Sequence, residues 1–150
     1  MLRLTAPHIL LVTALAACAK ETPPRLEIVA ATAAAEVAPL IASEVAAAAR
    51  DQRTLLVYVG ATWCEPCRYF HAAAEAGQLD GTFGRLRLLE FDADRDTEAL
   101  ERAGYSAAMI PLFAVPRPDG TASGRQIAGS IKGAGAVAQI TPRLRALLAE

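Results

Sequence analysis

The chain has 150 residues, enough for one domain with a core of its own and too few for two. A hydrophobic share of 53% and a charged share of 21% are typical of a folded protein and exclude a disordered one. The net charge is −1, the basic residues are scattered among acids, and aromatic residues make up 5% of the chain. Because no basic stripe or stacking platform is present, we expect no nucleic-acid partner.

The first residues have the pattern of an export signal. Arg3 gives a short positive start, and the apolar run 9–17 (ILLVTALAA) ends in small residues. The run is too short to cross a bilayer but has the length of a signal-peptide core. Residues 15–18 (LAAC) resemble the lipobox of bacterial lipoproteins, where cleavage precedes a cysteine that is then lipidated. This resemblance implies a signal peptide at 1–17 and lipidation of Cys18; an ordinary secretory signal is the alternative.

This pattern also predicts a location and a domain boundary. Residues 19–35 contain Pro23 and Pro24 and show little periodicity, so we expect a lipidated N-terminus and tether at 18–35 and one domain at 36–150. The protein would lie in the bacterial cell envelope, on the periplasmic side, anchored to a membrane by lipid. Outside the cytosol two nearby cysteines form a disulfide unless something keeps them reduced.

From residue 36 on, the sequence predicts alternating helices and strands. The helices are expected at 39–50, 64–76 before Gly77, 94–103 before Gly104, and from Gly133 or Gly135 to 148. The strands are expected at 54–59, 85–92, 111–115 and, after a turn at 117–120, at 125–128. This order implies the α/β class, with a mixed sheet and helices on both faces.

Residues 60–71 (GATWCEPCRYFH) contain two cysteines three positions apart. A structural zinc site needs four ligands, and once Cys18 is lipidated the mature chain offers only Cys64, Cys67 and His71, so we expect no metal. Covalent haem attachment needs a histidine directly after the second cysteine, where Arg68 stands. A static disulfide remains an alternative, although so small a loop adds little stability through chain entropy.

A redox role suits the pair better. Cys64 begins the predicted helix, where unpaired N–H groups and the helix dipole favour the thiolate that attacks in disulfide exchange. Cys67 lies one turn further along, where it can attack the resulting mixed disulfide. Pro66 removes an amide donor and stiffens the turn between them. The charge of Glu65 disfavours the thiolate, which argues against a strongly oxidising pair.

The motif WCEPC, preceded by an apolar strand and Ala-Thr, resembles the thioredoxin superfamily, especially its exported TlpA-like and cytochrome-maturation branches. Residues 105–112 (YSAAMIPL) resemble the segment that ends in the family's cis-proline, which would place Pro111 opposite the thiols. The resemblance covers residues 40–148 and implies a thioredoxin fold. It also implies a protein thiol–disulfide oxidoreductase in which Cys64 attacks, Cys67 resolves, and substrate contacts come from Trp63, Ile110 and Pro111.

The same resemblance implies the partners. We expect a reductase, monomeric, with no cofactor other than the redox-active Cys64–Cys67 disulfide. Its partners would be thiols and disulfides of envelope proteins and a membrane-bound electron donor. The competing hypothesis is a non-catalytic binding module of the same fold, in which the disulfide stays closed.

The chain departs from the family at two positions. Thioredoxins proper carry a buried aspartate six residues before the first cysteine, where it helps to move the second thiol's proton; Tyr58 stands there instead. Gly60 replaces a bulky aromatic residue that is often found ahead of the motif. Glu90 or Asp92, on the neighbouring predicted strand, are the candidates for the missing acceptor. His71, four residues after Cys67, is either a proton relay or simply packed.

Overall fold

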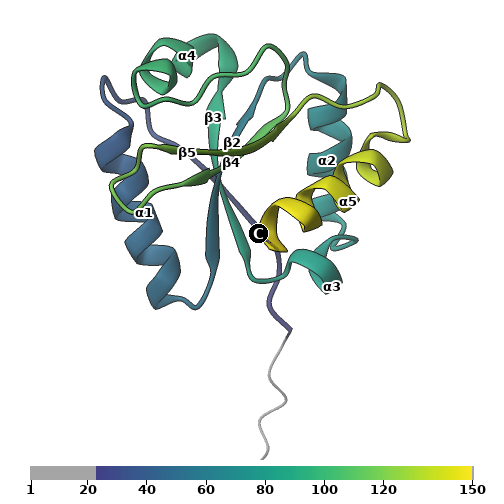
Figure 1. The fold of residues 1–150 in the computed structure, drawn as a ribbon. Helices are drawn as coiled ribbons and strands as arrows, with labels where there is room; N and C mark the ends of the chain where they lie inside the picture. Colours follow the sequence, from purple (N-terminus) through teal and green to yellow (C-terminus); the bar gives the residue numbers. More distant parts are fainter. Residues whose placement is uncertain (1–22, 150) are drawn as a thin grey trace, which may run out of the picture.

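A five-stranded sheet runs through the molecule in the order β1-β3-β2-β4-β5 (Figure 1). The computed structural model describes residues 23–149. The strands are β1 (Glu27–Ala30), β2 (Thr54–Gly60), β3 (Leu86–Asp92), β4 (Leu112–Pro116) and β5 (Ala122–Ala128). Strand β3 pairs in parallel with β1 and β2, whereas β4 pairs antiparallel with β2 and β5. The predicted mixed sheet is confirmed.

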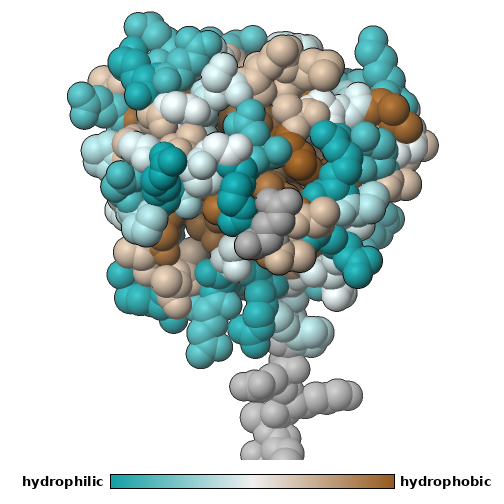
Figure 2. All heavy atoms as spheres, in the orientation of Figure 1, coloured by the Kyte–Doolittle hydropathy of each residue, from teal (hydrophilic) through white to brown (hydrophobic). Residues whose placement is uncertain are grey.

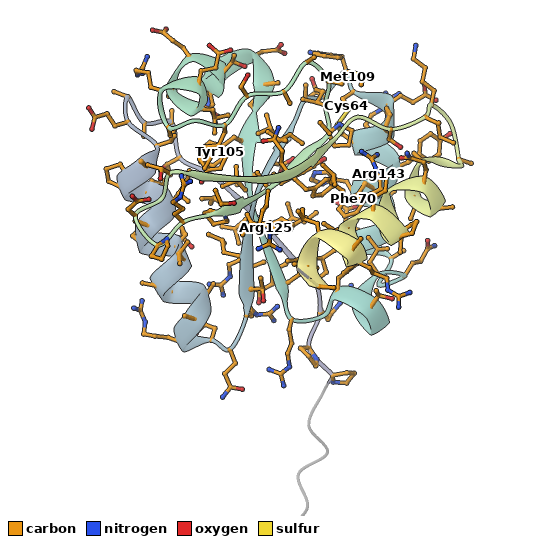
Figure 3. All side chains as sticks on the ribbon, viewed as in Figure 1. Cys64, Phe70, Tyr105, Met109, Arg125 and Arg143 are labelled. Atoms are coloured by element: carbon orange, nitrogen blue, oxygen red, sulfur yellow. A yellow bond between two sulfur atoms is a disulfide. The ribbon has the colours of Figure 1, made fainter. Side chains whose placement is uncertain are left out.

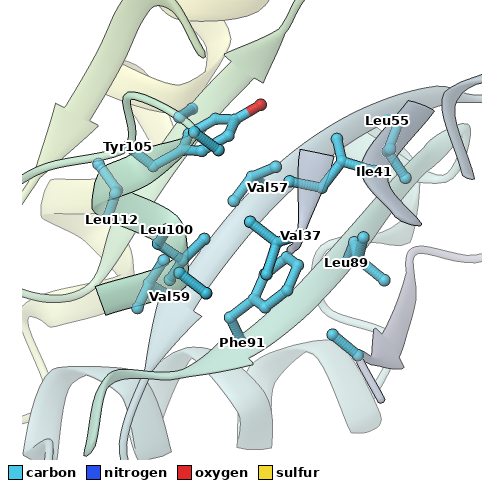
Figure 4. Close-up of a cluster of buried hydrophobic side chains, with 14 of the residues drawn as sticks. Val37, Ile41, Leu55, Val57, Val59, Leu89, Phe91, Leu100, Tyr105 and Leu112 are labelled. Atoms are coloured by element: carbon cyan, nitrogen blue, oxygen red, sulfur yellow. The ribbon is translucent and has the colours of Figure 1, made fainter. Parts of the chain in front are cut away.

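Helices cover both faces of the sheet. Helices α1 (Ala38–Arg50) and α4 (Ala93–Arg102) pack on one face, and α2 (Glu65–Glu75), α3 (Asp80–Phe83) and α5 (Ala136–Ala149) pack on the other (Figure 1). The core under α1 and α4 includes Ile41, Leu89, Phe91 and Leu100 (Figure 4). The core under α2, α3 and α5 includes Phe70, Phe113, Ile140 and Leu144. The predicted α/β class is therefore confirmed.

Strand β2 lies at the centre of the sheet and supplies the site. Its sequence, TLLVYVG, is buried at every position except the first. A strand covered by helices on both faces has a continuous run of apolar residues instead of alternating apolar and polar ones, so its sequence pattern predicts a strand clearly.

The exterior is mostly hydrophilic in the view of Figure 2, with small apolar areas between the polar side chains.

The predicted tether is wrong in the part of it that the structure describes. Residues 27–30 form β1, an edge strand whose register runs from Glu27 opposite Arg87 to Ala30 opposite Glu90. Just before it, Arg25 forms an ion pair with Asp80 at 2.9 Å. The physical reason is that the open edge of β3 offers unpaired N–H and C=O groups, which the short EIVA stretch satisfies. The expected signal peptide at 1–17 and Cys18 lie outside the described residues.

The remaining predicted elements are confirmed, with small shifts at their ends. The sequence missed the one-turn helix α3, and β5 begins at Ala122, three residues before the predicted return strand. Gly77 and Gly104 follow α2 and α4 with φ angles of +72° and +89°, a conformation that glycine adopts easily at helix ends. None of the helices between residues 23 and 149 is long and apolar enough to span a membrane.

Candidate active site

The two cysteines lie where β2 leads into α2. They form a disulfide with a Cα–Cα distance of 5.3 Å. Cys64 is the N-cap of α2, and its sulfur accepts a hydrogen bond of 3.3 Å from the backbone N–H of Cys67. Pro66, in the first turn, lacks an N–H that would have had no helical partner there. The expected position of Cys64 at a helix start, where N–H groups favour a thiolate, is thus confirmed.

A groove of about 600 Å³, which we call the front groove, opens beside Cys64. Cys67 is not among the residues that line it. Its walls come from the start of α2, from α4, from the loop before β4 and from the loop after β5; they include Trp63, Glu65, Pro66, Glu101, Met109, Ile110 and Lys132.

The predicted Ile-Pro segment reaches this groove. The Ile110–Pro111 peptide bond is cis, as the resemblance implied. Ile110 lines the front groove and packs on the cluster formed by the two cysteines. Pro111 is buried behind it and is not among the lining residues, and its carbonyl accepts a hydrogen bond of 2.9 Å from the N–H of Gly129. Of the two residues, Ile110 is the one in position to touch a partner.

Two large apolar side chains stand exposed at the groove. Trp63 is 64% exposed and Met109 is 63% exposed. The indole N–H of Trp63 donates a hydrogen bond of 2.8 Å to the carboxylate of Asp94, in the first turn of α4. Figure 3 shows Met109 next to Cys64 at the same end of the molecule. The sequence analysis missed both residues. The only signal for Met109 was its position next to Ile110, and the only signal for Asp94 was its place among the acidic residues of 92–96.

A second hollow, which we call the rear cavity, lies beside Cys67. Its volume is about 390 Å³, and Cys64 is not among its lining residues. The polar groups that line it come from three elements: Arg68 and His71 from α2, Glu90 and Asp92 from β3, and Arg95 from α4. The two sulfurs of one disulfide therefore face different surroundings.

His71 and Glu90 form a pair at the rear cavity. The His71 Nε2 and Glu90 Oε1 atoms lie 2.7 Å apart, and both side chains are about 30% exposed. The hydrogen bond with Glu90 raises the pKa of His71 above its usual value, although partial burial opposes this shift. Among residues 23–149, no group of three or more histidine, cysteine, aspartate or glutamate side chains is placed to hold a metal ion.

Tyr58, at the position of the family's aspartate, cannot serve as a proton acceptor. It is fully buried, and its hydroxyl has no hydrogen-bond partner among the described residues. Burial, together with the nearby charge of Glu90, raises the pKa of Tyr58 far above its usual value, so the ring stays a neutral phenol. A Cβ atom on Gly60 would lie 3.0 Å from this hydroxyl, which shows that the two departures from the family fit together sterically.

The register between β2 and β3 distinguishes Glu90 from Asp92, the two candidates for the acceptor of the second thiol's proton. Glu90 lies directly opposite Tyr58 in the β2–β3 pairing and contacts His71. Asp92 lies opposite Gly60, and its carboxylate accepts the backbone N–H groups of Asp94 and Arg95 as the N-cap of α4. Glu90 is therefore the carboxylate available near the thiols.

With its strand order, its disulfide at the start of α2 and its cis Ile110–Pro111 bond just before β4, the chain has the thioredoxin fold expected from its sequence. No protein-family model matches the chain, and no curated protein matches it. Among solved structures it is similar to thioredoxin O1 from Arabidopsis thaliana in the oxidized state, with 15% identity, a TM-score of 0.48, and coverage of 82% of this chain and 96% of that one.

Two further solved structures give similar values. A poplar thioredoxin h has 18% identity, a TM-score of 0.48, and coverage of 84% of this chain and 98% of that one. A chain from a study of thiol resolution in yeast mitochondrial 1-Cys peroxiredoxin via glutathione/thioredoxin systems has 21% identity and a TM-score of 0.48. That alignment covers 79% of this chain and 94% of that one.

Proposed function

We propose that the protein is a thiol–disulfide oxidoreductase that acts on other proteins through Cys64 and Cys67. The observation that carries this proposal is the placement of the disulfide at the N-terminus of α2. Of its two cysteines, Cys64 lines the front groove and Cys67 does not. A disulfide that served only as a staple would need neither a helix N-terminus nor an adjacent groove. It would also close a very small loop, where the gain in stability is least.

The chemistry follows from this placement. In the reduced form, the Cys64 thiolate attacks one sulfur of a partner disulfide, and the other partner sulfur leaves with the electron pair and takes up a proton. Cys67 then loses its proton and attacks the sulfur of Cys64, which closes the disulfide seen in the structure and releases the partner's second thiolate. Two electrons have passed to the partner, and the reverse sequence would oxidise it.

The front groove favours an extended peptide as the partner. Trp63 and Met109 offer exposed apolar surface in the groove that Cys64 lines, and Ile110 lines the groove as well and packs against the cysteines. The charged residues that line the groove have both signs: Glu65, Glu101, Arg68 and Lys132. We therefore expect a preference for partner cysteines flanked by apolar residues, with little selection for the partner's net charge.

The exchange is tested with 5,5′-dithiobis(2-nitrobenzoate), a small chromogenic disulfide, and the reduced full chain carrying Cys18→Ser, so that Cys64 and Cys67 are its only thiols. This parent chain, the wild type for the other variants, should release two equivalents of thionitrobenzoate, one for each step. Cys67→Ser should release one equivalent and keep a mixed disulfide, and Cys64→Ser should lose the fast first step. If Cys64→Ser reacts as fast as the wild type, or if mild reductant leaves both sulfurs unavailable to alkylation, the disulfide is a structural one.

The direction we propose is reduction of partner disulfides. Glu65 lies in the first turn of α2, next to Cys64, and its negative charge opposes the very low thiol pKa of strong oxidants. The measurement is the reduction potential of the pair, from equilibrium with glutathione. We expect a value well below that of the strong periplasmic oxidants, and a value near about −120 mV would contradict a reductase.

We also propose that the protein is exported and lipid-anchored at Cys18, with envelope proteins as substrates and a membrane-bound electron donor. The support is the lipobox-like sequence 15–18 after a short apolar run. Because Arg25 and β1 dock on the body of the domain, at most about seven residues separate Cys18 from it, a reach of roughly 25 Å. An enzyme held so close would meet partners at the membrane surface.

The anchor is tested by detergent phase partitioning of the wild type and of Cys18→Ser. A diacylated cysteine holds a protein on a membrane stably, so the wild type should enter the detergent phase and the variant the aqueous phase. If processed protein of both forms stays in the aqueous phase, residues 1–17 are an ordinary secretory signal.

A further inference from the structure

We infer that the His71–Glu90 pair receives the proton that Cys67 loses when it attacks the mixed disulfide. This inference rests on the proposed thiol exchange and assigns one of its proton transfers. Cys67 is 2% exposed in the structure, and burial disfavours the thiolate that the attack requires. A base that shares a cavity with Cys67 lowers this cost by taking the proton as the new bond forms.

The rear cavity brings this base and Cys67 together. His71 follows Cys67 by four residues on α2, so both side chains lie on the same face of the helix. Both residues line the rear cavity, as does Glu90. The volume of about 390 Å³ has room for water, which would carry the proton between sulfur and imidazole.

The other titratable groups that line the rear cavity or pack beside it are unsuited to this task. The carboxylate of Asp92 is held by the two N–H groups that it caps. Arg68 and Arg95 are permanent cations and have no basic form at neutral pH. Tyr58, which packs against His71 with ring centroids 5.7 Å apart, is a neutral phenol.

The charge state of the pair follows from its contacts. Glu90 is hydrogen-bonded to the His71 ring and raises the pKa of His71, and Glu75 on the same helix adds a smaller effect of the same sign. Above that pKa, neutral imidazole beside ionised Glu90 is the form that accepts a proton. The charged and titratable groups that surround His71 are Glu90 and Asp92 of β3, Tyr58 of β2, Arg68 and Glu75 of α2, Arg95 of α4 and Arg25 ahead of β1.

The step balances without an additional reactant. The S–H bond of Cys67 breaks and its proton passes to Nδ1 of His71, because Nε2 carries the hydrogen that it donates to ionised Glu90. The bond between the sulfurs of Cys67 and Cys64 forms, and the bond between Cys64 and the partner sulfur breaks. The electron pair of the broken bond leaves with the partner as a thiolate, and the partner disulfide is the oxidant.

The experiment follows the second phase of the reaction with 5,5′-dithiobis(2-nitrobenzoate) by stopped flow between pH 5 and 9, using the full chain with the same Cys18→Ser replacement. The wild-type rate should rise with pH through an inflection above about pH 6.5, the ordinary pKa of histidine. His71→Asn should remove this inflection and slow the second phase on the order of 10-fold to 100-fold near pH 7.5. The first phase should not change, which shows that the variant is folded.

Glu90→Gln tests the role of the carboxylate. Because it removes the interaction that raises the His71 pKa while partial burial remains, the inflection should move to lower pH. Glu75→Gln is the matched control, since it removes a carboxylate from α2 that does not bond to the ring, and it should shift the inflection much less. The His71 ring signal in NMR titrations, identified by its loss in His71→Asn, should follow the same order.

The outcomes separate this inference from the proposed function. If the wild type shows no second phase, the proposed exchange fails. If the second phase is present but has the same pH profile in His71→Asn, the inference is wrong. It is also wrong if the wild-type rate falls as His71 loses its proton, because a protonated ring that stabilises the Cys67 thiolate would then be the active form.

Discussion

Cys64 and Cys67 are bonded to each other, yet each lines a different hollow of the protein. The front groove beside Cys64 carries exposed apolar side chains, Trp63 and Met109 among them. The rear cavity beside Cys67 is smaller and is lined by the hydrogen-bonded pair of His71 and Glu90. One side therefore suits contact with a partner, and the other suits the handling of a proton.

The difference shows how one short motif separates two chemical tasks. Cys64, the N-cap of α2 with extended backbone, lines only the front groove, and Cys67, within the first turn, lines only the rear cavity. The N-terminus of α4 borders both hollows, because Asp94 holds the ring of Trp63 and Arg95 lines the rear cavity. Changes in α4 should therefore affect both sides, whereas changes in one hollow should leave the other intact.

The largest expected effect comes from the buried carboxylate at the start of α4. Asp96 is 4% exposed, accepts the backbone N–H of Asp92 at 2.9 Å and pairs with Arg95 at 2.7 Å. Asp96→Ala leaves these donors without their acceptor and should lower the free energy of unfolding by about 3 kcal/mol. Urea denaturation measures this loss, and both hollows should become less ordered.

The matched control is Glu98→Ala on the same helix. Glu98 pairs with Arg102 at 2.9 Å, but its side chain is 90% exposed. We expect a change below about 0.5 kcal/mol, as for other exposed pairs. Equal losses in the two variants would mean that Asp96 does not hold the start of α4.

The second prediction concerns the front groove alone. Trp63→Ala removes the exposed ring and should lower kcat/KM for a protein disulfide about tenfold, in the range of a single aromatic contact. The rate with the small chromogenic disulfide should change less than about twofold, because that probe makes little use of the groove. Comparable losses with both substrates would show that Trp63 acts on the thiols and not on the partner.

Asp94 offers a graded version of the same test. Asp94→Ala removes the acceptor that holds the indole N–H at 2.8 Å, whereas Asp94→Asn keeps an oxygen acceptor. We expect a several-fold loss with protein substrates for the alanine variant and a smaller loss for the asparagine variant. Identical results for the two variants would mean that this hydrogen bond does not position Trp63.

A third prediction tests the steric fit between Tyr58 and Gly60 in β2. Gly60→Ala places a methyl group about 3.0 Å from the Tyr58 hydroxyl and should destabilise the fold by about 1 kcal/mol. Tyr58→Phe removes an unpaired buried hydroxyl and should stabilise it by about 1 kcal/mol. In the double variant the cost of the methyl group should be smaller, which thermal unfolding of all four proteins would reveal as non-additivity. Strict additivity would contradict the steric coupling.

The smallest expected effect is the pH dependence of stability at the ion pair. Because the His71 pKa is raised in the folded state, the pair stabilises the protein fully below about pH 6.5 and loses this contribution as pH rises through the raised value. The stability difference between the wild type and Glu90→Gln should therefore be larger at pH 5.5 than at pH 8.5. A difference that grows with pH, measured by urea denaturation, would contradict the pairing.

The sequence predicted the fold well where local patterns carry the information. The apolar run of β2, the motif at its end and the glycines after α2 and α4 each mark a local feature, and the structure confirms them. The strand β1 was missed because its four residues are half-buried or exposed at the sheet edge. Its partner β3 lies some 60 residues later, at Arg87 opposite Glu27, so no local pattern marks the pairing.

The sequence located the cysteine pair at the start of α2 and pointed to Trp63 and Ile110, which line the front groove with Cys64. The position of the acceptor could not be predicted, because it depends on the register between β2 and β3, which places Glu90 and not Asp92 beside His71. The fit of Tyr58 against Gly60 likewise depends on the packing of a ring along one face of the sheet. The sequence identifies such residues as candidates, and the tertiary pairing chooses between them.

The central claim is that Cys64 meets the partner and Cys67 resolves. The most direct measurement is alkylation of the reduced wild type with limiting iodoacetamide at pH 7, followed by peptide mass spectrometry of each cysteine. Since the thiolate at the helix N-terminus reacts and lines the open groove, Cys64 should carry at least about ten times more label than Cys67. Equal labelling, or more label on Cys67, would contradict the assignment of the two sulfurs.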